Sequence, residues 1–281
     1  MRMTTTGRLL AYGAMLLVGL VVAAPLVWLL IMSVSSTRDL TTLPLHWLPH
    51  ELDFSRYVRL LTLSPNSDGE VFLYALRNTL EIAAGTVAVS FLMAVPAAWL
   101  IARRQGRLQW LLLLVVATYM LPPLLFVVPL YHVFSSMTLL NSPWALMIAD
   151  STVVLPFTAW LLKGGIESIP AELEQAAAMD GAKLWYIWLA ITLPLARPII
   201  STTILFGVLM VWDEFLYAMI FTSDQNAQTL TVVIANLAAG RVSDYGLLSA
   251  AGVLVALPPV LIGIFLQRSL VSGLTTGSVK G

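Results

Sequence analysis

The sequence predicts an all-α membrane protein with six transmembrane helices, and three observations support this class. Hydrophobic residues make up 59% of the 281-residue chain, whereas charged residues make up only 11%. The mean hydropathy is +0.87, and so few charged side chains cannot cover a water-soluble globule of this size. The third observation is a series of apolar runs that approach or exceed the roughly 20 residues needed to cross a bilayer.

The apolar runs define the expected elements. In chain order, the expected spans are 9–32, 82–102, 108–131, 143–162, 198–223 and 247–266. The first run follows Arg2 and Arg8 as a signal peptide would, but it is longer than the apolar core of such a peptide. We therefore expect a retained anchor, and we expect residues 1–281 to form a single transmembrane domain.

Prolines mark both the loops and the spans. The first outer loop, residues 33–77, contains Pro44, Pro49 and Pro65, so we expect turns and short helices on the membrane surface. Residues 135–142 and 223–245 are expected to be further outward connections. Prolines inside the spans either kink helices that must open and close or reflect the ordinary frequency of proline in membrane helices. These prolines are Pro96, Pro122, Pro123, Pro129, Pro156, Pro258 and Pro259.

Lysine and arginine predict the orientation, because cytoplasmic loops carry an excess of them. With both termini in the cytoplasm, ten basic residues lie inside and five lie outside. The inner set is Arg2, Arg8, Arg103, Arg104, Arg107, Lys163, Lys183, Arg197, Arg268 and Lys280. The outer set is Arg38, Arg56, Arg59, Arg77 and Arg241.

Composition and motifs exclude several classes. The absence of cysteine excludes disulfides, iron–sulfur clusters and thiolate zinc sites, and the net charge of zero gives no reason to expect nucleic-acid binding. His46 and His50 are separated by Pro49, which argues against a shared metal-binding helix face. No catalytic motif is present, so we expect neither an enzyme nor a metal site.

A charged segment at residues 172–198 interrupts the apolar spans. Pro170 suits a first helical turn, and Glu172 and Glu174 lie near the positive end of the helix that follows. Gly181 is expected to end this helix in a left-handed conformation, with a second helix over residues 183–190. One face of the first helix would carry Leu173, Ala176, Ala177 and Asp180.

The spacing within this segment resembles the cytoplasmic signature of membrane subunits of binding-protein-dependent ABC importers. The matching pattern is Gln175-Ala176-Ala177, then Gly181, then Ile191-x-Leu193-Pro194. The family usually has glutamate where this chain has Gln175, so the amide keeps hydrogen-bonding capacity but not charge.

Further motifs resemble the maltose-type carbohydrate permeases of that family. They are Leu121-Pro122, Val128-Pro129-Leu130-Tyr131, Asn141, Leu155-Pro156-Phe157, Trp212-Asp213-Glu214-Phe215-Leu216, Gln228-Thr229-Leu230 and the tail Gly273–Gly281. The resemblance implies the type I importer permease fold, with residues 168–197 as a coupling elbow between spans four and five. The docking residues that it implies for an ATPase are Glu174, Gln175, Ala176, Ala177, Asp180 and Gly181.

The resemblance also implies partners. They are a second, non-identical permease subunit, a cytoplasmic ATPase dimer and an extracytoplasmic solute-binding protein, with a sugar or oligosaccharide as substrate. ATP would bind to the partner ATPase and this chain would carry no cofactor. The location implied is the bacterial cytoplasmic membrane.

Carboxylates inside the spans indicate a translocation path, because a charge in a membrane helix normally faces a cavity or a partner. The expected path residues are Asp150, Trp212, Asp213, Glu214 and Tyr217. Asp150, Asp213 and Glu214 would otherwise bond to neighbouring helices, and the aromatic residues would otherwise be packing. Two alternatives remain open: the same architecture importing a polyol phosphate or peptide, and a stand-alone secondary transporter.

Overall fold

The computed structural model describes residues 5–42, 47–104, 106, 108–240 and 244–275. Within these ranges every regular element is a helix, and one isolated bridge joins Ser35 to Leu52. The all-α prediction is thus confirmed for the described part of the chain. Arg2, His46, Arg241, Lys280 and the end of the predicted tail, from residue 276 onward, lie outside it.

The chain divides into two compact units. One unit comprises Met1–Leu73 and Ile234–Leu257, and the other comprises Tyr74–Val233 and Pro258–Gly281. Two long helices, α4 (Asp68–Arg103) and α14 (Tyr245–Thr275), contribute residues to both units. The single domain expected from the sequence stays a prediction.

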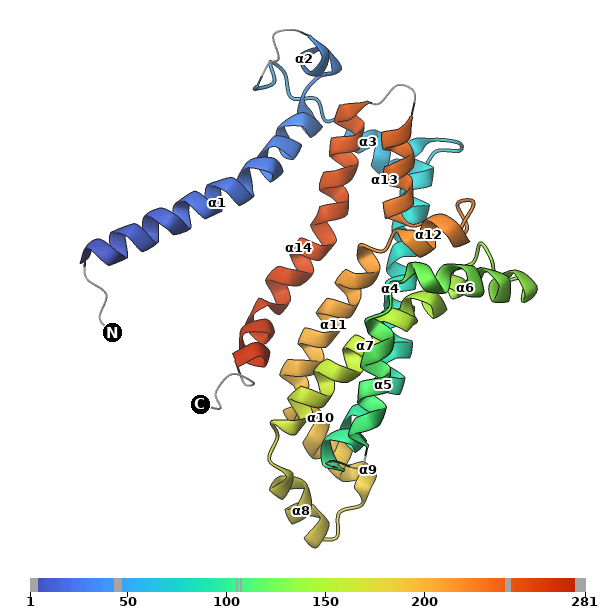
Figure 1. The fold of residues 1–281 in the computed structure, drawn as a ribbon. Helices are drawn as coiled ribbons and strands as arrows, with labels where there is room; N and C mark the ends of the chain where they lie inside the picture. The colour runs from blue at the N-terminus through green and yellow to red at the C-terminus, as the bar shows by residue number, and fades with distance from the viewer. Residues whose placement is uncertain (1–4, 43–46, 105, 107, 241–243, 276–281) are drawn as a thin grey trace. The chain divides into compact units, whose positions relative to one another are not determined.

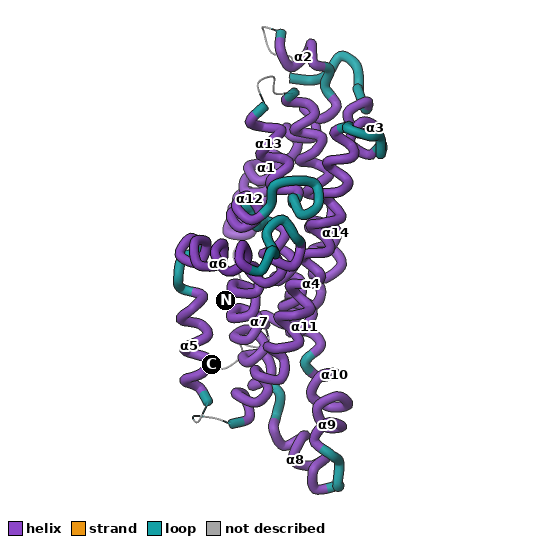
Figure 2. The backbone as a smooth tube through the Cα atoms, turned by 90° about the vertical axis from the view of Figure 1, so that its right-hand side faces the viewer, coloured by secondary structure: helices purple, strands orange, loops and turns teal. Residues whose placement is uncertain are grey.

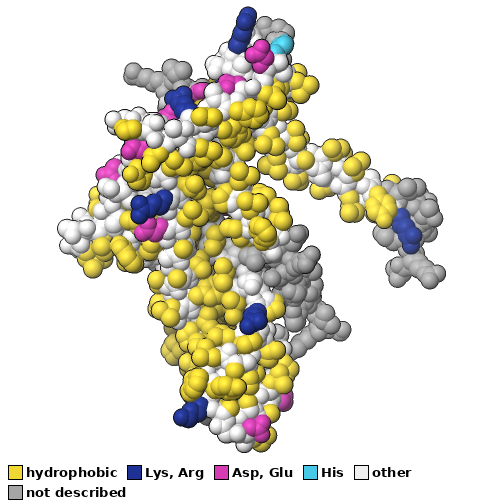
Figure 3. All heavy atoms as spheres, turned by 180° about the vertical axis from the view of Figure 1, so that it is seen from behind, with side chains coloured by type: hydrophobic (Ala, Val, Ile, Leu, Met, Phe, Trp, Pro, Cys, Tyr) yellow, Lys and Arg dark blue, Asp and Glu magenta, His cyan; other side chains and the backbone are white. Residues whose placement is uncertain are grey.

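Four helices are long and apolar enough to span a membrane. They are α1 (Thr5–Val34), α4 (Asp68–Arg103), α7 (Pro143–Glu167) and α14 (Tyr245–Thr275). Apolar side chains of α1 such as Leu16 and Leu20 are more than 60% exposed, and hydrophobic side chains predominate on the face drawn in Figure 3. Such a surface suits a hydrocarbon environment.

The third predicted span, 108–131, is bent in the structure. It consists of α5 (Gln109–Tyr119) and α6 (Leu124–Ser136), which meet at 92°. Pro122 and Pro123 occupy the corner, where proline removes backbone donors and disfavours a helical conformation in the preceding residue. Figure 2 shows α6 turning away from the direction of α5 at this corner.

The fifth predicted span, 198–223, is interrupted. Helix α11 (Arg197–Trp212) stops at Asp213, and the short helix α12 (Leu216–Phe221) begins after it. Helix α13 (Leu230–Ala239) then forms where the sequence predicts only an outward connection. A second bent pair consists of Leu184–Leu195 and Arg197–Trp212, which meet at 73°. If this pair and the α5–α6 pair each count as one span, the described residues hold up to six candidate spans.

In the first unit, a buried arginine joins the segments of the outer loop. Arg56 lies on α3 (Ser55–Leu61) and is 4% exposed. Its guanidinium donates to the Ser35 carbonyl and, at 3.0 Å, to the hydroxyl of Thr37 on α2 (Thr37–Thr41), and it lies 3.3 Å from Asp244. The short helices predicted for residues 33–77 are therefore present and held by one cation.

Small residues on α4 form the centre of the second unit. At every fourth position the buried face of this helix carries a residue that is at most 2% exposed: Thr86, Ser90, Ala94, Ala98 and Ala102. Small side chains at this spacing let membrane helices approach closely. Figures 1 and 2 agree that α4, α7 and α11 run side by side.

The N-terminal half of α4 also holds a distant loop. The Asn78 side chain donates to the Gln225 and Gln228 carbonyls at 2.9 and 3.1 Å. The Thr79 hydroxyl accepts a 3.0 Å hydrogen bond from the amide of Leu230, the first residue of α13. These bonds satisfy backbone groups that the turn between α12 and α13 leaves unpaired.

Two adjacent glycines on α7 provide a test of this packing. A Cβ added at Gly165 would lie 2.7 Å from Ile199 Cβ on α11, whereas a Cβ added at Gly164 would meet nothing within 4 Å. We expect Gly165→Ala to lower stability by about 1–3 kcal/mol through overpacking. Gly164→Ala should be neutral or slightly stabilising, since alanine is the better helix former.

The measurement is thermal unfolding of both variants in lipid nanodiscs, followed by tryptophan fluorescence. Equal transition temperatures for Gly165→Ala and Gly164→Ala would contradict the close α7–α11 contact.

Candidate functional site

The segment between α7 and α11 forms a helix–glycine–helix elbow at one end of the second unit (Figure 1). It consists of α8 (Ala171–Met179), α9 (Leu184–Ile187), a π-helical turn, η1 (Trp188–Thr192), and α10 (Leu193–Leu195). Gly181 has φ +83° and ends α8 as the sequence predicts. The Gly181 amide donates to the Ala178 carbonyl at 3.1 Å and the Ala182 amide donates to the Ala177 carbonyl at 3.0 Å. This paired arrangement is a Schellman motif.

Most of the predicted docking residues are exposed on α8 and its turn. Gln175, Ala176, Asp180 and Gly181 are exposed, and Ala177 is half-buried. Met179, which the sequence did not single out, is 84% exposed next to them. The elbow therefore presents the small side chain of Ala176 and the bare backbone of Gly181, flanked by Met179 and the carboxylate of Asp180. Its docking role stays a prediction.

Glu174 has a different environment from its neighbours, because its carboxylate points into the molecule. Arg103, at the end of α4, donates to both carboxylate oxygens at 3.0 and 2.9 Å. Trp99 donates its indole N–H at 3.3 Å and Thr192 donates its hydroxyl at 2.7 Å. The Glu174 and Arg103 side chains are only 11% and 14% exposed. Glu174 thus fastens the elbow to α4, although the sequence grouped it with the docking residues.

The surroundings of Glu174 change its acidity. Burial alone would raise the pKa of this carboxyl, but hydrogen bonds from Arg103, Thr192 and Trp99 outweigh burial and hold the pKa below its ordinary value of 4.5. The charged form is therefore the one that the folded elbow prefers near neutral pH. Arg103 also donates to the Ile169 carbonyl at 3.1 Å, so it binds the chain on both sides of Pro170.

The sequence did not predict this cluster. The sequence predicts only that Arg103 is one of the cytoplasmic basic residues, and it gives no role to Trp99 or Thr192. A signal was available, since an arginine closing a long helix and a glutamate in the next charged segment are opposite charges on the same predicted side of the membrane.

A second group of predicted residues lines a cavity of about 310 Å³ at the break between α11 and α12. Asp150, Asp213, Glu214 and Tyr217 all belong to its lining. Trp212 does not belong to the lining and is 2% exposed, so the structure separates it from the other four.

The lining residues differ in how far their polar groups are satisfied. The Glu214 carboxylate accepts hydrogen bonds from the Tyr217 and Ala218 amides at 2.6 and 3.0 Å, which caps the first turn of α12. Tyr217 is 1% exposed, stacks on Phe221 at 5.6 Å and donates its hydroxyl to the Pro123 carbonyl at 3.2 Å. Its ring is therefore a packing element and is not free to stack on a sugar.

Asp150 is 4% exposed, and its Oδ1 atom has no hydrogen-bond partner. It lies on α7, which packs against both α11 and α12. A buried oxygen without a partner is costly, and such an atom in a native structure requires an explanation.

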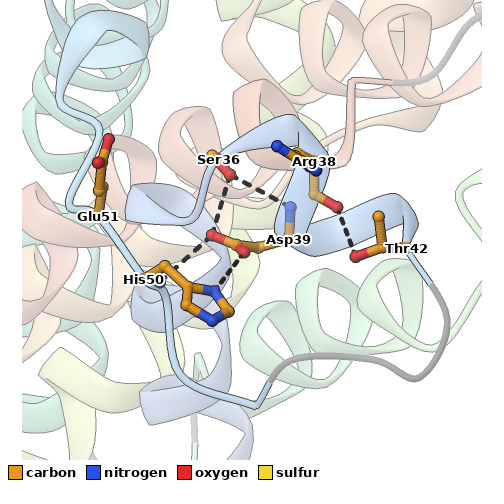
Figure 4. Close-up of a pocket in the computed structure, with 6 residues that line it drawn as sticks. All are labelled: Ser36, Arg38, Asp39, Thr42, His50 and Glu51. Carbon is orange, nitrogen blue, oxygen red and sulfur yellow. Dashed lines mark hydrogen bonds and ion pairs between the residues drawn. The ribbon is translucent and has the colours of Figure 1, made fainter.

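The first unit contains a polar cavity of about 470 Å³ that lies outside the predicted site. Figure 4 shows Ser36 and His50 converging on Asp39. The Asp39 carboxylate accepts from Ser36 at 2.9 Å and lies 2.8 Å from His50 Nδ1. The side-chain bond to His50 is the main reason that the pKa of Asp39 is below its ordinary value. These contacts join α2 to residue 50 and so close the loop between them. The residues that the structure describes contain no cluster of three possible metal ligands.

The Glu174 cluster generates a stability prediction. Arg103→Ala would leave a buried carboxylate unpaired, which costs about 3 kcal/mol. We expect the elbow, residues 171–195, to lose protection in amide hydrogen exchange while the rest of α4 keeps it. Arg104→Ala is the matched control, because Arg104 is exposed. Equal protection of the elbow in the two variants would contradict the fastening role.

The lowered pKa predicts how this stability depends on pH. Since the pKa of Glu174 is lower in the folded elbow than in an unfolded one, its contribution is complete above pH 4.5 and is lost as pH falls through the folded-state pKa. Exchange protection of residues 171–195, corrected for intrinsic rates, should therefore fall in acid below pH 4.5.

Glu174→Gln should remove this acid-dependent loss, whereas the exposed control Glu172→Gln should retain it. A Glu174→Gln variant with the wild-type pH profile would assign the effect to another group.

Comparison with known proteins was made for the whole chain. A family model described as "Binding-protein-dependent transport system inner membrane component" matches residues 70–276. The sulfoquinovosyl glycerol transport system permease of Agrobacterium fabrum is 31% identical over 258 residues, which covers 92% of this chain and 88% of that protein. The trehalose/maltose transport system permease of Thermococcus litoralis is 28% identical over 285 residues and covers 100% of both chains.

The fold is also similar to a solved structure. A chain from a bacterial ABC transporter involved in the import of the acidic polysaccharide alginate matches with a TM-score of 0.78 and 22% identity, over 95% of this chain and 99% of that chain. This likeness confirms the predicted permease fold. Because the family model covers most of the sequence, including the elbow, this chain belongs to the family of binding-protein-dependent transport system inner membrane components.

Proposed function

We propose that this chain is one membrane-spanning subunit of an ATP-driven ABC importer and forms part of the translocation path for a sugar or oligosaccharide. The observation that carries the proposal is the elbow: a glycine-terminated helix with exposed small side chains, in a chain of the binding-protein-dependent family. The relatives named for sulfoquinovosyl glycerol and for trehalose and maltose support the sugar assignment.

In this proposal the elbow is the docking surface for a cytoplasmic ATPase. Ala176 adds almost no bulk, so a groove in the partner can approach the backbone of α8 closely. Gln175 offers an amide where the family usually has a carboxylate, and it can donate as well as accept hydrogen bonds. Both termini would then be cytoplasmic, in agreement with the excess of basic residues on that side.

The Glu174 cluster, which consists of Glu174, Arg103, Trp99 and Thr192, would transmit motion of the docked ATPase to the spans. An ATPase dimer that closes on ATP would displace α8, and the bonds to Arg103 would carry that displacement into α4. Helix α4 packs through small residues against α7 and α11, so the helices around the cavity would move with the elbow. ATP would be hydrolysed on the partner, and this chain would perform no covalent chemistry and bind no cofactor.

The remaining partners follow from the same proposal. One subunit of this size supplies one half of a path, so a second, non-identical permease would complete it. A solute-binding protein outside the membrane would deliver the sugar, in keeping with the description of the family. An importer for another solute, such as a polyol phosphate or peptide, would use the same elbow.

Docking can be tested by substitution at an exposed elbow position. Ala176→Arg should reduce recovery of the ATPase with the tagged subunit at least tenfold, or about 1.4 kcal/mol, because a long charged side chain would hold the two surfaces apart. Gln109→Arg is the matched control, since Gln109 is exposed at the start of α5 and lies outside the elbow. The measurement is co-purification from native membranes, with subunit abundance determined in parallel.

Normal ATPase recovery with Ala176→Arg would refute the docking role. Recovery of neither an ATPase nor a second permease with the wild-type chain would favour a stand-alone secondary transporter driven by ions.

A further inference from the structure

The cavity at the α11–α12 break contains three carboxyl groups and, among its described lining residues, no lysine, arginine or histidine. The three groups belong to Asp150, Asp213 and Glu214. Carboxylates are acceptors only, so a molecule that bonds to them must offer hydrogen-bond donors. The carboxyl groups of the lining therefore favour solutes that offer hydrogen-bond donors.

Glu214 is already committed to the fold. Both of its carboxylate oxygens accept amides of the first turn of α12, and its backbone carbonyl accepts the Thr231 hydroxyl at 2.6 Å. Its lone pairs are largely occupied by these capping bonds, so it offers little acceptor capacity to a solute.

Asp150 is the group with unused capacity. It is more than nine-tenths buried, it lines the cavity, and its Oδ1 atom has no hydrogen-bond partner. Glu214 lines the same cavity, so two acidic side chains border the same space. A donor arriving in the cavity would satisfy an oxygen that the protein itself leaves unpaired.

Asp213 extends this acidic lining to the surface. It follows the 16-residue helix α11, so it lies about 24 Å along the axis from Arg197 at roughly 1.5 Å per residue. Asp150 lies about 26 Å from Glu167 at the end of α7 by the same rise per residue. In the proposed orientation, with Arg197 and Glu167 at the cytoplasmic membrane surface, both carboxyl groups lie within a hydrocarbon core of about 30 Å, where a carboxylate normally faces a cavity or a partner.

We propose that this cavity is a donor-accepting, anion-rejecting part of the translocation path, with Asp150 as the residue that receives a hydroxyl or ammonium donor from the passing solute. The inference rests on the proposed transport function and deepens it. The solute is then a neutral polyhydroxylated sugar or an aminated one, and not a sugar acid. This solute would differ in charge both from alginate and from sulfoquinovosyl glycerol, a sulfonate for which the 31% identical relative is named.

A chain without cysteine allows a direct measurement of this potential. Val153→Cys places a single thiol in the cavity lining, one helical turn from Asp150. The probes are two methanethiosulfonate reagents of similar size, one with a quaternary ammonium and one with a sulfonate. The complete, purified transporter in nanodiscs is labelled with each reagent, with and without ATP, and the modified fraction of this chain is followed by mass.

We expect the cationic reagent to react about tenfold faster than the anionic one, relative to the same ratio at Met137→Cys. Met137 is 60% exposed and lies outside the cavity lining. Both reagents attack the same thiolate, so the ratio cancels any effect of the carboxylates on thiol ionisation. Adding Asp150→Asn or Asp213→Asn to Val153→Cys should reduce the ratio several-fold.

The control for the neutralising substitutions is Glu81→Gln, which removes an exposed carboxylate of α4 outside the cavity and should leave the ratio unchanged. Phe215→Cys is a second reporter, because Phe215 also lines the cavity and is 39% exposed.

Equal rates for the two reagents would overturn the inference and leave the importer assignment standing, since that assignment is tested by co-purification. A ratio that persists in Asp150→Asn and Asp213→Asn would also overturn it, because the charge would then come from another subunit. Failure of both thiols to react in every nucleotide state would show that the cavity is not part of the path.

Discussion

The ion pair between Glu174 and Arg103 is the constraint that fixes the position of the elbow relative to α4. A short helix outside the membrane has little packing of its own, and α8 has only nine residues. Without a fixed attachment it would move independently of the spans. A buried ion pair with two further donors gives that attachment direction as well as strength, because bidentate geometry resists rotation. The exposed face of α8 is therefore held in one orientation relative to α4.

The two ends of the second unit are built on opposite principles. At the elbow, both oxygens of the Glu174 carboxylate are matched by donors, although Trp188 Nε1 nearby in the chain has none. At the α11–α12 break, the Oδ1 atom of Asp150 has no hydrogen-bond partner. The second unit also holds two apolar clusters, one containing Ala98 and Leu162 and the other containing Leu146 and Phe221.

Sequence reasoning reached the helical class, the elbow and its terminating glycine because these depend on local signals. Apolar run length and the conformational freedom of Gly181 are readable from a few neighbouring residues. It did not reach the corner at Pro122 and Pro123, because a proline pair inside an apolar run is compatible with both a kink and a right-angle break. It also missed α13, whose ten residues are too few to stand out as an apolar span.

Side-chain roles were harder to predict than positions. Glu174 and Gln175 are adjacent in the sequence, yet one is buried and the other exposed, and only the location of Arg103 decides which. Likewise, the sequence predicts Trp212 and Tyr217 as path residues with aromatic rings that could stack on a sugar, but both side chains are buried in the packed interior. Long-range partners determine these roles, and a single sequence does not reveal them.

The bonds from the N-terminal half of α4 to the loop before α13 have a consequence for how the protein is made. Asn78 and its acceptors Gln225 and Gln228 are 147 and 150 residues apart. At a synthesis rate of roughly 5–20 residues per second, α4 waits on the order of ten seconds before the ribosome has produced the loop that it holds. Until then, Asn78 and Thr79 lack the partners that they have in the folded chain. This contact therefore forms late in biogenesis, after most of the second unit has been made.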